Sequence, residues 1–68
     1  MQAPVRASQV SKILAAYREV HRELRAGSPA SLARAVAVLY AAQRVATPGE
    51  ADAADALWLA ELRSEVGV

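Results

Sequence analysis

The stretch "ATPGEA" at residues 46–51 decides how this chain folds, because it carries a complete helix-start signal. Thr47 can cap the helix through its hydroxyl, and Pro48 suits the first helical position, where its missing N–H would have no partner. Glu50 stands at the third position, where its carboxylate can reach back to the backbone of Thr47. These residues predict a capping box and the start of a helix at Pro48.

A second junction, "AGSPAS" at residues 26–31, has similar chemistry. Ser28 is the expected cap and Pro29 the first helical residue. Gly27 is expected to end the preceding helix in the left-handed conformation. The two junctions therefore divide the chain into three helical segments.

We predict an all-α fold in a single domain, residues 1–68, with helices at about 6–26, 29–46 and 48–66. Short connections place sequential helices antiparallel to each other, which makes the architecture a small three-helix, up-down-up bundle. Two apolar stripes at helical spacing are expected to face its core. They are Val10, Ile13, Leu14, Tyr17, Val20, His21 and Leu24 in the first helix, and Ala51, Ala54, Trp58, Leu62 and Val66 in the third.

The size and composition predict a thin core. A chain of 68 residues buries only about 60% of the surface that its unfolded form exposes. It has no cysteine and a single histidine, so disulfides and the usual zinc sites cannot stabilise it. Its stability must come from helix packing or from a partner.

The second helix is apolar on all sides, since Gln43 is the only polar residue between Arg34 and Arg44. Two neighbouring helices cannot easily cover such a helix, so part of it is expected to meet another chain or a lipophilic ligand. Two alternatives stay open. Exposed alanine and valine cost little, and "AVAVLY" at 35–40 could form a buried strand, which its alanines disfavour.

Charge is unevenly distributed along the chain, although the formal net charge is only +1. Residues 1–46 carry seven basic and two acidic groups, whereas residues 47–68 carry five acidic groups and one arginine. In the first helix, Arg18, Arg22 and Arg25 form a row along one edge. This asymmetry predicts either an acidic partner or pairing within the fold, for example between Asp55 and an arginine of the first helix.

The sequence carries no catalytic signature, and we predict that the protein is not an enzyme. His21 has no second histidine, cysteine or Gly-rich loop to work with, so it is interpreted as a packed or interface residue. Asp52 and Asp55 could supply half of a metal site, but acids are expected at a helix start, and no metal site is predicted. No segment is apolar enough over about 20 residues to span a membrane.

Nucleic-acid binding is a lesser alternative. Arg18, Arg22 and Arg25 could contact phosphates, but the second helix presents mainly alanine and valine where a recognition helix presents polar side chains.

Two stretches carry a resemblance to a known family. "ILAAYREVHREL" at 13–24 resembles the signature of the LYR-motif proteins, a Leu-Tyr-Arg triplet followed by a further arginine. Tyr17, Arg18 and Arg22 match that pattern, while Ala16 stands where leucine is typical. "VLYAAQRVATPGEADAADALW" at 38–58 is similar to the family's junction between its second and third helices, with Tyr40 in place of the usual phenylalanine. The similarity covers about residues 10–65.

The resemblance implies a three-helix accessory subunit or assembly factor of the mitochondrial matrix. Such proteins serve iron–sulfur cluster biogenesis or respiratory complexes, commonly docked to an acyl carrier protein whose acylated phosphopantetheine enters the helical core. It implies no cofactor of the chain's own. The expected partner-binding residues are Tyr17, Arg18, His21, Arg22, Arg25, Val38 and Tyr40.

An alternative from another class is a small helical regulator of the bacterial cytoplasm or of a phage, either antitoxin-like or associated with DNA. Such a protein would associate with itself or bind a partner, and a GC-rich genome would explain the alanine content.

Overall fold

The computed structural model describes residues 4–67 and confirms the all-α, three-helix prediction. Helix α1 spans Ala7–Ala26, α2 spans Pro29–Arg44 and α3 spans Pro48–Val66. The second helix ends two residues earlier than predicted. Thr47 must be extended because it precedes a proline, and Val45 and Ala46 form the turn that leads into it.

Both predicted caps are present. Thr47 Oγ1 accepts a hydrogen bond from the Glu50 N–H at 3.2 Å, and Glu50 Oε1 accepts one from the Thr47 N–H at 2.9 Å. Ser28 caps α2 in the same way with Ser31 as its counterpart. The prediction of a left-handed Gly27 is wrong, because its backbone is extended, with φ −92°. A Cβ at this position would displace the end of the Glu23 side chain and would lie 2.9 Å from the Glu23 carbonyl oxygen, so glycine gives the closest fit.

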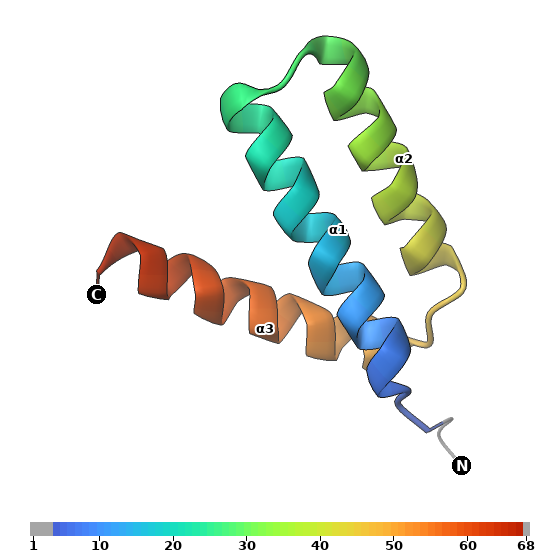
Figure 1. Cartoon of the computed structure of the whole chain (residues 1–68). Coiled ribbons are helices and arrows are strands. Elements are labelled where there is room, and N and C mark those ends of the chain that lie inside the picture. Colours follow the sequence, from blue (N-terminus) through green and yellow to red (C-terminus); the bar gives the residue numbers. More distant parts are fainter. Residues whose placement is uncertain (1–3, 68) are drawn as a thin grey trace.

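Helix α1 is the centre of the fold. It packs against both α2 and α3, whereas α2 and α3 hardly touch each other. Figure 1 shows α1 and α2 as an antiparallel hairpin, with α3 crossing the start of α1 and then running away from both helices. The bundle is therefore closed where α3 begins, which we call the closed end, and open where α3 and the last turns of α1 diverge, which we call the open end.

The core lies near the closed end and is as thin as predicted. Ile13 and Ala54 are fully buried, and Val10, Ala16 and Leu39 complete the buried cluster. The alanines allow the helices to approach closely, but each contributes little apolar area.

The predicted stripes extend farther than the core does. Leu24 on α1 and Val66 on α3 are exposed, because the two helices have separated by the time the chain reaches them. Helix α2 also exposes apolar side chains, Val38 and Tyr40 among them, as its composition predicts.

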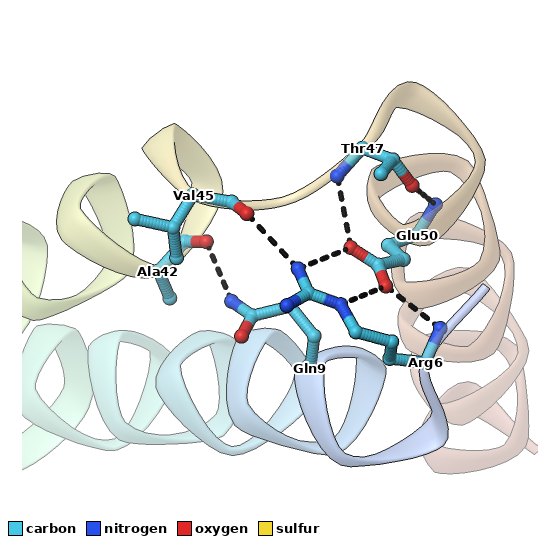
Figure 2. Close-up of polar contacts among 6 residues, drawn as sticks. All are labelled: Arg6, Gln9, Ala42, Val45, Thr47 and Glu50. Atoms are coloured by element: carbon cyan, nitrogen blue, oxygen red, sulfur yellow. Dashed lines mark hydrogen bonds and ion pairs between the residues drawn. The ribbon is translucent and has the colours of Figure 1, made fainter. Parts of the chain in front are cut away.

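A buried carboxylate holds the closed end together (Figure 2). Glu50 has no exposed surface, and it accepts hydrogen bonds from the backbone N–H, Nε and Nη2 of Arg6 at 2.7, 2.8 and 3.0 Å. Arg6 Nη2 also donates to the Val45 carbonyl at 3.1 Å, and Gln9 Nε2 donates to the Ala42 carbonyl at 2.8 Å. The start of α1 is thereby tied to the end of α2 and to the start of α3.

The same contacts change the acidity of Glu50. Hydrogen bonds from the Arg6 side chain and then from the Thr47 backbone lower the pKa of the Glu50 carboxyl to about 2. The folded chain therefore stabilises the ionised form of Glu50.

Candidate partner-binding site

Three of the predicted site residues meet where α1 and α3 diverge, and the others do not join them. Tyr17 and His21 face α3, and Arg18 lies beside them on the same helix. Val38 and Tyr40 lie on the exposed surface of α2. Arg22 and Arg25 lie on the exposed edge of α1, so the predicted set is divided among the α1–α3 contact, this edge and α2.

An aromatic cluster forms the α1–α3 contact. The ring of Trp58 stacks on that of Tyr17 with centroids 5.8 Å apart, and the ring of His21 meets Trp58 edge-on at 5.4 Å. Both arrangements are favourable for aromatic pairs. The rings of α1 and α3 thus contact each other just before the two helices diverge.

The Tyr17 hydroxyl links all three helices. It donates a hydrogen bond to the carboxylate of Asp55 on α3 and accepts one from Gln43 Nε2 on α2 at 3.0 Å. Partial burial, and then the bond to Asp55, raise the pKa of Tyr17 above its ordinary value. The suggested pairing of Asp55 with an arginine of the first helix is wrong, because the tyrosine hydroxyl takes this carboxylate.

Arg18 pairs with a different acid of α3. Its Nε and Nη2 donate to Glu61 Oε1 at 3.0 and 2.5 Å, and these bonds raise the pKa of the guanidinium. Together with the contact between Arg6 and Glu50, this pair joins the basic part of the chain to its acidic part. Pairing within the fold, one of the two outcomes predicted from the charge asymmetry, therefore occurs at two places.

The three arginines that form the row in α1, Arg18, Arg22 and Arg25, are called the arginine edge below. Arg22 pairs with Glu19 on its own helix, and Arg25 makes no ion pair with any residue in the described range 4–67. The Arg18 and Arg22 side chains remain 57% and 71% exposed despite their pairs. Most of this edge is thus accessible to another molecule.

Two hollows lie on either side of the contact between His21 and Trp58, which line both of them. The outer hollow, about 390 Å³, is completed by Arg18, Glu61, Ser64 and Glu65. The inner hollow, about 150 Å³, is completed by the apolar parts of Tyr17, Val20, Leu24 and Leu62. The outer hollow borders the arginine edge, whereas the inner one faces the α1–α2 hairpin. Val38 lines a third hollow, of about 350 Å³, between α1 and α2.

The His21 ring lies between an aromatic neighbour and polar ones. Its ring packs edge-on against Trp58, and its neighbours in the outer hollow are charged or hydroxyl side chains. Across residues 4–67, no group of three or more histidine, cysteine or acidic side chains is arranged to hold a metal ion.

Within the described part of the chain, none of the helices combines the length and apolar character that crossing a membrane requires.

Sequence reasoning missed two residues of this site as site residues. Trp58 was assigned only to the core stripe, yet it is half-buried and lines both hollows. Glu61 was counted only among the acids of the third helix. One signal was available, because Glu61 stands three residues after Trp58 and helix positions three apart are neighbours.

No protein-family model matches this chain, and no match is found among curated proteins or solved structures. The candidate site is therefore defined by its own geometry, as an arginine edge beside an aromatic contact and an outer hollow.

Proposed function

We propose that this protein is a small non-enzymatic adaptor or accessory subunit that docks onto a partner protein through the arginine edge and the outer hollow. The observation that carries the proposal is the exposure of the paired arginines. Arg18 and Arg22 keep more than half of their side-chain surface accessible, directly beside a hollow lined by Trp58.

The chemistry of this edge favours an acidic partner. A guanidinium has five N–H donors, and Arg22 uses only one nitrogen in its contact with Glu19. Arg25 adds a further cation. Carboxylates of a partner could be bound bidentately by the remaining donors, which makes Arg more selective than Lys at such a surface.

The resemblance to LYR-motif proteins names the first candidate, an acyl carrier protein in the mitochondrial matrix. Its acidic surface would meet the arginine edge, the polar phosphopantetheine arm would lie in the outer hollow, and the acyl chain that it carries would pack on the ring of Trp58. The chain would need no cofactor of its own in this role.

A second candidate is a bacterial or phage regulator that associates with itself. It is favoured by the exposure of Val38 and Tyr40, which lie on two different sides of α2 and away from the arginine edge.

Trp58 provides a direct test, because it is the only tryptophan and it lines the outer hollow. Titration with an acyl carrier protein, in unmodified and acylated forms, should change Trp58 fluorescence with saturation, and the acylated form should bind more tightly. The double substitution Arg22→Glu/Arg25→Glu should abolish binding with little loss of helicity, since the ion pair it removes, between Arg22 and Glu19, lies on the solvent-exposed side of α1. Arg18 is left in place because its removal would also weaken the α1–α3 contact.

The matched control is Lys12→Glu/Arg34→Glu, which makes the same change in charge at two exposed positions away from the edge. It should bind as the unmodified protein does. If both double variants lost binding equally, net charge alone would explain the loss. If binding were saturable and neither variant altered it, the arginine edge would not be the binding surface.

A further inference from the structure

The chain exposes more surface than a compact protein of its size. Its accessible surface is 4913 Å², whereas a compact monomer of 7.2 kDa is expected to expose about 4,100 Å². Its radius of gyration is 12.8 Å, against about 11 Å for a compact domain of this length. The excess, about 800 Å², equals what one partner contributes to a standard protein–protein interface.

Two of the exposed apolar side chains, Leu24 and Tyr40, lie with the half-buried Val36 on one face of the α1–α2 hairpin, which we call the open face. Tyr40 is 62% exposed and lies one turn before Gln43, on the side of α2 from which Gln43 reaches Tyr17. Leu24 is 64% exposed at the rim of the inner hollow. In a closed bundle α3 would cover this face, but here it has already diverged.

The diverging part of α3 carries a complementary surface, which we call the α3 ridge: Leu59, Leu62 and Val66. Their spacing of three and four residues places them along one side of the helix. Leu59 and Val66 are exposed, and Leu62 borders the inner hollow. The chain thus holds both an uncovered apolar face and an uncovered apolar ridge, and its own geometry does not bring them together.

Charge indicates which surfaces pair. Helix α2 carries Arg34 and Arg44 and no acid. Of the five acids of α3, Glu50, Asp55 and Glu61 are already bound within the chain, which leaves the exposed Asp52 and Glu65 for another molecule. Contact between two copies of α2, or between two copies of α3, would oppose like charges. Contact between α2 of one copy and α3 of another joins opposite charges.

We infer that this protein forms a symmetric dimer in which the α3 ridge of each copy packs on the open face of the other. A two-fold axis makes both contacts at once, so that each copy gives and receives one ridge. The inner hollow is covered in this dimer, while the arginine edge and the outer hollow lie on the other side of the contact between His21 and Trp58. The inference therefore does not depend on partner docking at the arginine edge, and it deepens the second candidate, the self-associating protein, by naming the two surfaces that pair.

Sedimentation equilibrium across a range of concentrations tests the dimer. The unmodified protein should reach twice its monomer mass of 7.2 kDa. Tyr40→Glu on the open face and Leu59→Glu on the α3 ridge should each weaken association by roughly a hundredfold, because each places an unpaired charge in the apolar contact. Leu57→Glu is the matched control, because this exposed leucine lies on another side of α3 and its substitution should leave the dimer unchanged.

Mixing the two disrupted variants tests reciprocity. A dimer of Tyr40→Glu has two damaged open faces and a dimer of Leu59→Glu has two damaged ridges, so neither keeps an intact contact. A mixed dimer keeps one, between the α3 ridge of Tyr40→Glu and the open face of Leu59→Glu. The 1:1 mixture should therefore associate more strongly than either variant alone, with circular dichroism confirming that both are folded. A monomeric unmodified protein, an equal effect of Leu57→Glu, or no recovery on mixing would each overturn the inference.

Discussion

The closed end and the open end use the same two helices in different ways. At the closed end, small residues such as Ala16 and Ala54 let the helices approach, and the buried Glu50 carboxylate joins α3 to Arg6, which also reaches the Val45 carbonyl at the end of α2. At the open end, α1 and α3 meet only through the rings of Tyr17, His21 and Trp58 before they diverge, and Leu24 is exposed. Two straight helices that cross at an angle must diverge on either side of their contact. This chain therefore has its buried core at one end, and the surface that we propose for binding lies at the other.

The largest effect should come from the core of the closed end. Ile13→Ala removes a fully buried side chain and should lower the free energy of unfolding by about 2–5 kcal/mol, a large part of the stability of a domain this small. Leu24→Ala at the open end should change it by less than about 0.5 kcal/mol. Urea unfolding of dilute protein measures both, and equal losses would show that the two ends are equally packed.

Lowering the pH should have the next largest effect on stability, and it should act on the closed end. The pKa of Glu50 falls from 4.5 to about 2 in the folded chain, so the unfolded chain takes up the proton first as the pH is lowered. The ionised Glu50 carboxylate contributes fully to stability above pH 4.5, and this contribution should be lost as the pH falls toward 2. The urea midpoint of the unmodified protein should drop across this window, and that of Glu50→Gln should start lower and change less.

Glu19→Gln serves as the comparison for the acid experiment. Arg22 also lowers the pKa of Glu19, but this carboxylate lies on the surface of a single helix. A surface pair contributes little to stability, so this variant should keep most of the pH dependence of the unmodified protein. If it removed as much as Glu50→Gln does, the buried carboxylate would not be the main acid-sensitive group.

The smallest of these effects should come from the caps. Thr47→Ala removes the side-chain acceptor at the start of α3 and should cost about 1 kcal/mol, seen as a lower melting temperature. Thr47→Ser keeps the acceptor and should restore most of the loss. Ser28→Ala should cost a similar amount, since the two caps have the same geometry. A much larger cost at Thr47 would mean that its substitution also disturbs Glu50.

Sequence reasoning recovered only part of the candidate site. Tyr17, Arg18 and His21 were predicted together, and they do lie together, because residues three and four apart share a helix face. The partners that these residues meet on α3, namely Asp55, Trp58 and Glu61, could not be assigned, since their positions depend on how α3 crosses α1. Val38 and Tyr40 were predicted for the same site, but they lie on α2. Whether any of these residues binds a partner is still a prediction.

The sequence by itself determined the three helices and both capped junctions, because caps depend on residues within one turn of each other. It also determined that α2 would expose apolar surface, because no polar face interrupts its sequence. Only the tertiary structure decided that Arg6 would bury Glu50, that Asp55 would bind Tyr17 rather than an arginine, and that α3 would leave the hairpin. Those outcomes depend on contacts between residues far apart in the sequence, 44 positions for Arg6 and Glu50 and 38 for Tyr17 and Asp55, which no local pattern specifies.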